Sequence, residues 1–176
     1  MRMSNNSVKF WNDTWKREKD RHYKHFEFIA NKIDDKAKVI DIGCGCGTLL
    51  RYLRNVRPDL KLEGQDHSDY AIKRLKSEFL RAKVVVLPEV QGIANVIIAT
   101  EVFEHIKDDE KLLKNCSLAA NKLILTVPND RLGPEECNEH ERKYTSKSLE
   151  EKLSKFYQHY EIYEIEGYLL AISWNK

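Results

Sequence analysis

The stretch VIDIGCGCGTLL, Val39–Leu50, is the part of this 176-residue sequence that decides the fold. A β-branched run ends at Ile42, three glycines then alternate with two cysteines, and an apolar run with helical character follows. This order of strand, glycine-rich loop and helix is typical of the first turn of a nucleotide-binding βαβ unit. Glycines in such a loop adopt backbone angles barred to other residues and let a ligand approach the main chain.

The spacing of the glycines narrows the kind of ligand. The dinucleotide pattern G-x-G-x-x-G fails because Thr48 stands at its third glycine position, and the phosphate loop G-x4-G-K-[ST] is absent. The observed spacing, D-x-G-x-G-x-G, therefore favours a ligand without a pyrophosphate.

The cysteines of the loop raise the alternative of a metal or redox site. Cys44 and Cys46 lack the C-x2-C spacing typical of zinc sites. A zinc tetrad of these two with Cys137 and His140 is conceivable, although no spacing pairs the two halves. Small side chains suit the variable positions between glycines, so we interpret the loop cysteines as incidental free thiols.

Around the loop, apolar runs alternate with helical patterns. This alternation predicts an α/β, Rossmann-like fold, with a seven-stranded, mostly parallel sheet, helices on both faces and a C-terminal antiparallel hairpin. The predicted strands are Lys38–Ile42, Lys61–Gln65, Lys83–Leu87, Asn95–Ala99, Lys122–Val127, Tyr160–Glu166 and Tyr168–Trp174. The predicted helices are Thr48–Asn55, Ser68–Arg81, Asp108–Ala120 and Ser146–Phe156, the last capped by Thr145 or Ser146.

Two regions complicate this plan. Only seven residues separate Leu87 from Asn95, fewer than a parallel crossover usually takes, so either the third strand is shorter or its helix is reduced to a loop. At the N-terminus, Lys9–Ile33 shows helical periodicity in one or two amphipathic helices, with Trp11, Trp15, His22, Phe26, Ile29 and Ile33 on one face. We expect residues 1–36 to form a helical cap and residues 37–176 to form one structural unit.

Composition excludes several function classes. The net charge of +2 gives no strong signal for nucleic acid. No apolar run approaches the roughly 20 residues that span a bilayer, and the N-terminus lacks the apolar segment of a signal peptide. We therefore expect no membrane partner and a cytoplasmic location.

Four segments together resemble class I S-adenosylmethionine-dependent methyltransferases. VIDIGCGCG is similar to their first motif, LEGQDHS at Leu62–Ser68 to their second, and NVIIATEVFEHI at Asn95–Ile106 and LILTVPN at Leu123–Asn129 to the motifs of their fourth and fifth strands. The resemblance implies S-adenosylmethionine as cofactor, with Asp66 accepting both ribose hydroxyls and His67 lying against the adenine. The implied cofactor-binding residues are Asp41, Gly43, Cys44, Gly45, Gly47, Asp66, His67, Ala99 and Thr100.

The sequence departs from the family pattern after the third strand. The acidic residue that often reads the adenine amino group is missing from VVVLPEVQG, where Glu89 is a candidate substitute. Asn95 stands where many relatives carry Asp. No large insertion follows the fifth strand, so the substrate cap is small and is built from Asp130–Lys143, with the N-terminal helices as a further candidate.

The segment after the fourth strand carries the candidate chemistry. Glu101, Glu104 and His105 spell E-x-x-E-H at the carboxyl end of a central strand, where α/β sheets hold ligands, and His140 follows in the cap. This combination resembles ubiquinone-pathway O-methyltransferases and small-RNA 2′-O-methyltransferases, which implies a divalent metal, Mg or Mn, on these four residues, with His105 and His140 as catalytic residues. Alternatively, as in metal-free relatives, the histidine caps a helix and the glutamates form ion pairs. We interpret Tyr144, which follows the cap, as a packing residue.

The resemblance implies methyl transfer to a hydroxyl of a small molecule, a glycan or an RNA end. Two other classes stay open at this point. One is a module that binds the cofactor without transferring methyl, suggested by the shortened third-strand region. The other is a nucleotide-linked oxidoreductase, which the glycine spacing at Thr48 disfavours.

Overall fold

The computed structural model describes residues 6–17, 23–78 and 81–176. Its strands are β1 Lys38–Ile42, β2 Lys61–Asp66, β3 Ala82–Val84, β4 Ala94–Thr100, β5 Ala120–Pro128, β6 His159–Ile165 and β7 Tyr168–Trp174. Its helices are α1 Val8–Arg17, α2 His25–Asn31, α3 Thr48–Val56, α4 Asp69–Lys76, η1 Phe103–His105, α5 Asp109–Ala119 and α6 Ser146–Leu153.

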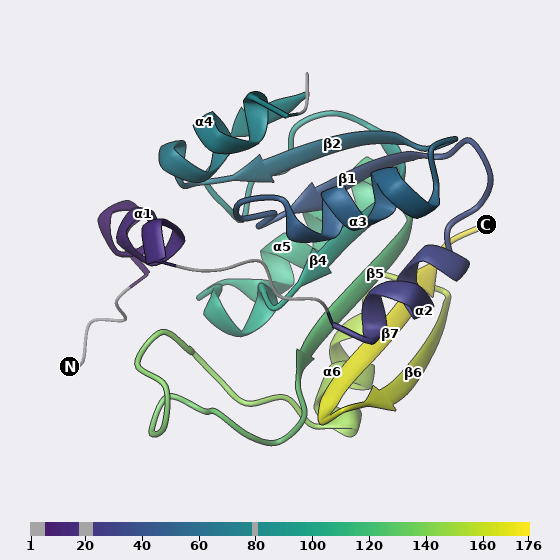
Figure 1. Ribbon diagram of the computed structural model, residues 1–176. Helices are drawn as coiled ribbons and strands as arrows, with labels where there is room; N and C mark the ends of the chain where they lie inside the picture. The colour runs from purple at the N-terminus through teal and green to yellow at the C-terminus, as the bar shows by residue number, and fades with distance from the viewer. Residues whose placement is uncertain (1–5, 18–22, 79–80) are drawn as a thin grey trace.

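The strands form one seven-stranded sheet in the order β3-β2-β1-β4-β5-β7-β6 (Figure 1). The pairs among β1 to β5 are parallel, and β7 runs antiparallel to both β5 and β6. The predicted α/β fold with its closing hairpin is thus confirmed. Glu166 and Gly167 make the hairpin turn, and both have positive φ, as a two-residue turn with primed geometry requires.

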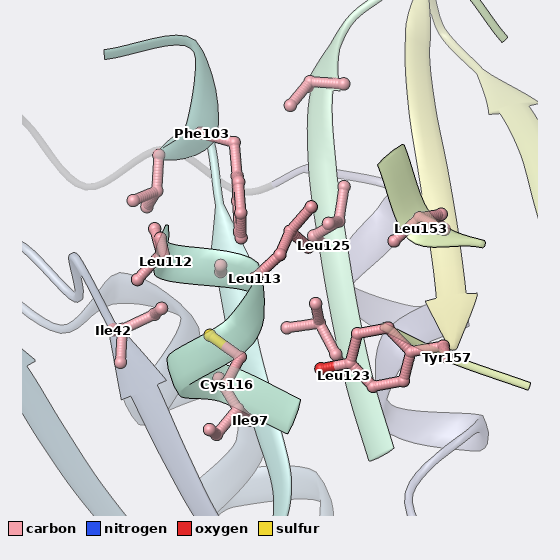
Figure 2. Packing of buried hydrophobic residues seen from close by; sticks show 14 of the residues in the cluster. Ile42, Ile97, Phe103, Leu112, Leu113, Cys116, Leu123, Leu125, Leu153 and Tyr157 are labelled. Atoms are coloured by element: carbon pink, nitrogen blue, oxygen red, sulfur yellow. The ribbon is translucent and has the colours of Figure 1, made fainter. Parts of the chain in front are cut away.

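Alternate residues of the central strands supply two apolar cores. On one face, α5 and α6 pack over Ile97 of β4 and Leu123 of β5, a core seen closely in Figure 2. On the other face, α2 and α3 pack over Val96 and Ile124. Because both faces are covered, the strands are nearly continuous apolar runs, which is the pattern that predicted a parallel sheet.

The third strand is where the predicted boundaries are wrong. It was expected at Lys83–Leu87, but β3 ends at Val84, and residues 85–93 reach β4 as a loop without a helix. Gln65, which is fully buried in β2, holds this loop: its side-chain amide accepts from the backbone N–H of Gln91 at 3.1 Å and donates to the Gln91 carbonyl at 2.5 Å. A buried amide that exchanges two bonds with the backbone fixes the short crossover without a helix.

The helix expected at Ser68–Arg81 also differs. It begins one residue later, with Ser68 as its N-cap, and α4 ends at Lys76. Residues 79 and 80 of the predicted helix lie outside the described residues, and so does His22, which was predicted on the apolar face of the N-terminal helices. Thr145 caps α6 in a capping box with Ser148, as one of the two expected caps.

The N-terminal helices occupy different places. α2 contributes Phe26 and Ile29 to the core over β1 and β4, whereas α1 contacts α4 and lies beyond the carboxyl ends of the strands (Figure 1). The division of the chain at residue 36 stays a prediction. Within the described ranges, no helix is long and apolar enough to cross a membrane.

Candidate functional site

A cavity of about 1020 Å³ lies at the carboxyl ends of β1, β2 and β4. In open α/β sheets this edge is where ligands bind. Of the residues predicted to bind the cofactor, those that line the cavity are Asp41, Gly43, Cys44, Asp66, His67 and Thr100. The topology therefore brings together residues from three strands that are far apart in the sequence.

The other three predicted contacts lie differently. Gly45 lies beneath the ring of Trp15, because a Cβ atom added at Gly45 would lie 2.6 Å from Trp15 Cη2. Gly47 is the left-handed N-cap of α3 and faces Leu75. Ala99 is fully buried in the core of the sheet. Gly47 and Ala99 thus have packing roles, and direct contact of either with a cofactor stays a prediction.

Asp66 has a task that sequence reasoning missed. Its Oδ2 accepts from the backbone N–H of Gly45 at 2.8 Å, and its Oδ1 accepts from the backbone N–H of Ser68 at 2.8 Å. The carboxylate thereby ties the glycine loop to the turn that begins α4. Any contact of Asp66 with ribose hydroxyls would use the remaining lone pairs of the same two oxygens.

Asp41 offers an unused acceptor. Its side chain is 1% exposed, and its Oδ1 has no hydrogen bond partner among the described residues. Burial, and then the neighbouring Asp66, raise the pKa of Asp41 well above its usual value. A buried carboxyl without a partner at the wall of a cavity suits a ligand that carries positive charge, such as an ammonium or a sulfonium group.

The part of the cavity wall that was expected to hydrogen-bond to the adenine amino group is apolar. Val86, Leu87 and Pro88 line the cavity at that place. Glu89 does not line the cavity and instead forms an exposed ion pair with Lys111 at 2.9 Å, so its role as substitute acid stays a prediction without support from this geometry.

The E-x-x-E-H segment forms the turn η1 directly after β4. Glu101 adopts a positive φ of 55°, a strained angle for a residue with a side chain, and its Oε1 accepts from the hydroxyl of Thr126 at 3.1 Å. Burial raises the pKa of Glu101 to about 7. Such strain at a strand end beside a cavity is typical of functional positions.

Glu104, His105 and His140 form one compact group. One potential ligand atom from each lies within 4.8 Å of those of the other two. The two imidazole rings meet edge to face, with 4.7 Å between their centroids. Glu101, the fourth predicted ligand, is not part of this group, although it lines the cavity together with His105.

The polar atoms of this group are partly unsatisfied. Both carboxyl oxygens of Glu104 and Nδ1 of His140 are buried and have no hydrogen bond partner in the described part of the chain. His105 Nδ1 lies 3.0 Å from the carbonyl of Glu139 and donates to it, so the lone pair of the neutral ring is on Nε2, which lies 3.9 Å from Glu104 Oε1. A carbonyl that orients a histidine in this way is a frequent support of metal ligands.

Burial sets the protonation of the same group. Burial, together with Glu101, raises the pKa of Glu104 well above its usual value. Burial lowers the pKa of His105 to about 4 and also lowers the pKa of His140. Both imidazoles are therefore neutral at pH 7, which is the form that binds metals. Two imidazoles and one carboxylate form a donor set known from zinc and iron(II) sites, whereas Mg and Mn prefer oxygen ligands, so this set does not by itself select the metal.

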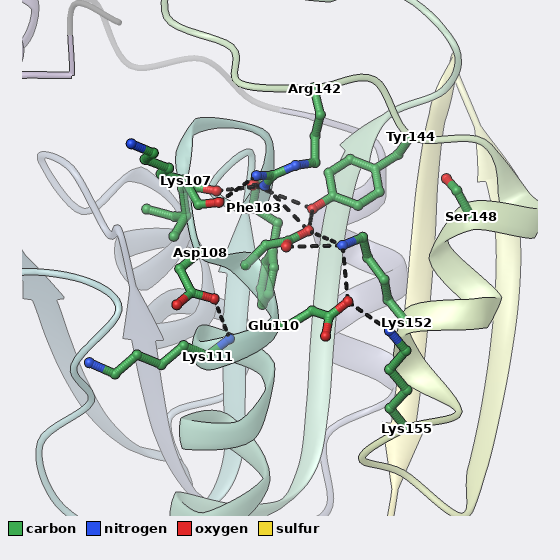
Figure 3. A network of polar contacts seen from close by, with 12 residues as sticks. Phe103, Lys107, Asp108, Glu110, Lys111, Arg142, Tyr144, Ser148, Lys152 and Lys155 are labelled. Carbon is green, nitrogen blue, oxygen red and sulfur yellow. Dashed lines mark hydrogen bonds and ion pairs between the residues drawn. The ribbon is translucent and has the colours of Figure 1, made fainter.

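The loop that carries His140 is anchored by a polar network (Figure 3). Arg142 donates to the carbonyls of Ile106 and Lys107, and the Tyr144 hydroxyl donates to Asp109 Oδ2 at 2.5 Å. Lys152 of α6 also binds Asp109, at 3.0 Å. Tyr144 is 1% exposed, so its interpretation as a packing residue is confirmed.

The cysteines form no metal site in the described ranges. The group of Glu104, His105 and His140 contains no cysteine. Cys44 packs against Gly64 in a small core, while the Cys137 thiol donates to Glu139 Oε2 at 2.9 Å. The zinc tetrad that was considered from the sequence is thus not assembled.

Comparison with known proteins agrees with this architecture. The family model described as "Methyltransferase domain" matches residues 15–166. A carboxy-S-adenosyl-L-methionine synthase from Campylobacter hominis is 26% identical over 152 residues, which are 81% of this chain and 59% of that protein. The chain thus spans about three fifths of the length of this curated relative.

Solved structures share the fold over nearly the whole chain. Magnesium protoporphyrin IX methyltransferase from Synechocystis, with bound S-adenosylhomocysteine (SAH), has a TM-score of 0.70 at 14% identity, covering 99% of this chain and 98% of that one. A TehB-like S-adenosylmethionine-dependent methyltransferase from Corynebacterium glutamicum has a TM-score of 0.68 at 19% identity, covering 98% of both chains.

Proposed function

This chain belongs to the class I S-adenosylmethionine-dependent methyltransferases, and we propose that it methylates a hydroxyl group of a small molecule, a glycan or an RNA end. The observation that carries the choice of a hydroxyl is the group of Glu104, His105 and His140 beside the cavity. A hydroxyl with a high pKa needs help to lose its proton, whereas many other acceptors do not.

We propose that the cofactor occupies the part of the cavity between β1 and β2. The unpartnered Oδ1 of Asp41 would accept from the cofactor's ammonium group, and Asp66 and His67 would border its ribose and adenine. Val86 and Leu87 supply an apolar wall in place of the acid found in many relatives. The unpartnered oxygen of Asp41 is an acceptor suited to an ammonium group, which S-adenosylmethionine carries and an anionic dinucleotide lacks.

The proposed metal site consists of Glu104, His105 and His140, with Glu101 as the further ligand implied by the resemblance. The buried oxygens of Glu104 and Nδ1 of His140 lack partners among the described residues, so the residues present fit a cation. A bound divalent ion would lower the pKa of an acceptor hydroxyl.

The remaining steps depend on the chain itself. The Glu139 carbonyl fixes the tautomer of His105. The walls of the cavity would hold the acceptor beside the methyl group, and positioning supplies much of the acceleration in such transfers.

A transfer screen tests this proposal. The purified protein is incubated with S-adenosylmethionine labelled in its methyl group and with pools of metabolites, saccharides or RNA, with and without excess chelator. We expect label in one pool, loss of transfer with chelator, and recovery with Mg or Mn.

Variants refine the screen. His140→Ala should reduce turnover at least tenfold and spare SAH binding, while the matched control His159→Ala, on the exposed edge strand β6, should behave as wild type. Full activity in chelator would refute the metal site. Cofactor binding without transfer to any pool would instead favour a binding module.

A further inference from the structure

Helix α1 and the residue Asn6 before it contribute to the wall of the cavity, and both are hydrogen-bonded to other segments. Asn6, two residues before the helix, donates to the carbonyls of His105 and Glu139 at 2.9 and 2.8 Å. Along the helix, Asn12 Nδ2 donates to Asp69 Oδ1 at 2.7 Å, and Asn12 Oδ1 accepts from the Ser68 hydroxyl at 2.5 Å. The helix is thus fixed to the segment that follows Asp66 and to the E-x-x-E-H turn.

These attachments place Trp15 directly over the glycine loop. A Cβ atom at Gly45 would lie 2.6 Å from Cη2 and 2.7 Å from Cζ2 of the indole. The Cys46 thiol lies 3.8 Å from the Trp15 carbonyl, which it approaches as a donor. The absence of a side chain at Gly45 therefore makes room for this ring.

A second tryptophan links Trp15 to the candidate catalytic group. Trp11 stacks on Trp15 with 5.8 Å between ring centroids and meets His105 edge to face at 4.9 Å. Trp11 and Trp15 both line the cavity. The helix thereby forms a continuous aromatic wall from the glycine loop to His105.

The indole N–H of Trp15 is unpaired among the described residues. Nε1 is buried and makes no hydrogen bond within the described ranges. An indole nitrogen is only a donor, and a buried donor without an acceptor is costly, so such a group in a ligand cavity points to an acceptor on the ligand. Asp41 and Asp66 line the same cavity and present acceptors, so a donor from α1 complements them.

We propose that Trp15 is a cofactor-binding residue, whose indole N–H donates a hydrogen bond to an oxygen of the cofactor, either its α-carboxylate or a ribose hydroxyl. This inference rests on the proposed function. It assigns to α1 a direct part in the site, beyond covering it.

Titration of Trp15→Phe with SAH tests the assignment. Phenylalanine keeps an aromatic ring over Gly45 and removes the N–H, so the affinity should fall about tenfold, the effect of one hydrogen bond of about 1.4 kcal/mol. Titration with 5′-methylthioadenosine, which lacks the amino acid part, identifies the acceptor. A loss confined to SAH assigns the carboxylate, and an equal loss for both ligands assigns the ribose.

Fluorescence provides an independent measurement. The chain has three tryptophans, and Trp174 lies on β7, away from this cavity. SAH should change the emission of wild type and of Trp174→Phe equally, and the change should be smaller in Trp15→Phe, where Trp11 is the one tryptophan left in the wall of the cavity. Circular dichroism should show the same folded spectrum for all three proteins.

The two proposals fail in different ways. Unchanged or tighter SAH binding by Trp15→Phe would overturn the role of Trp15 and would show that its ring merely covers the loop. If neither wild type nor Trp174→Phe binds S-adenosylmethionine or SAH, the proposed function is overturned, and this inference with it.

Discussion

Removal of one hydroxyl from the buried network should measure how firmly the cap loop is anchored. In Tyr144→Phe, the 2.5 Å hydrogen bond from the phenol to Asp109 is lost, and the apolar ring stays in its 1% exposed position. Hydrogen bonds to charged groups contribute about 1.5–3 kcal/mol. Asp109 keeps Lys152 at 3.0 Å and Arg142 at 3.3 Å, so no charge is left unpaired. We therefore expect a loss near the lower part of that range, about 2 kcal/mol.

The assay is urea unfolding followed by circular dichroism, with thermal unfolding in parallel. For a domain of this size, about 2 kcal/mol corresponds to a fall in Tm of about 4–8 °C. Tyr160→Phe is the matched control, because its hydroxyl binds Glu150 at 3.2 Å on the surface, and it should change stability by less than about 0.5 kcal/mol. Equal effects of the two substitutions would refute the reasoning that burial makes the Tyr144 bond strong.

Three further outcomes are expected. Asp66→Ala should lower both the cofactor affinity and the urea midpoint, because the Gly45 N–H also loses its hydrogen bond acceptor. A variant with the affinity and the midpoint of wild type would contradict this expectation. The double variant of Cys44 and Cys46 to Ala should bind SAH with an affinity within about threefold of wild type, as measured by calorimetry. Stoichiometric zinc in the wild-type protein that is lost in this variant would contradict the interpretation of these thiols as incidental. Because burial raises the pKa of Glu104, this carboxyl should lose its proton when Mn binds, and the affinity for Mn should increase as the pH rises from 6 to 8. Calorimetry in two buffers of different ionisation enthalpy measures both the proton release and the affinity. An affinity for Mn that does not depend on pH would exclude this carboxyl as a ligand.

The fold could be predicted because local signals and the global plan agree in most of the sheet. The β-branched runs at β1 and β4 are buried on both faces, so their sequence carries a clear strand signal. The third strand was misjudged because Val85 and Val86 extend its β-branched run, whereas a tertiary contact ends the strand. That contact, between Gln65 and the backbone of Gln91, joins residues 26 positions apart and leaves no local pattern.

The site was predictable to the extent that its residues lie at strand ends. Asp41, Asp66 and Glu101 all follow from where predicted strands stop, since a parallel sheet gathers those ends at one edge. Trp15 was assigned only to the apolar face of a helix, because periodicity shows which residues share a face and not what that face contacts. The repeated tryptophans of a short, strongly charged helix were the available signal, and an unpartnered indole N–H is visible only in three dimensions.

The acids of the cavity could oppose the reaction if they were ionised, because methyl transfer removes the positive charge from the sulfonium of the cofactor. Ionised carboxylates close to that sulfonium would stabilise its charge before the reaction and lose the interaction during it, which slows transfer. Burial raises the pKa of Asp41 and brings that of Glu101 to about 7, so these groups hold less negative charge than their number suggests. Asp66 is engaged on both oxygens by backbone N–H groups, which disperse its charge. With the cofactor placed as we propose, the cavity would recognise it through hydrogen bonds from its ammonium and ribose groups and would still allow the sulfonium to give up its charge.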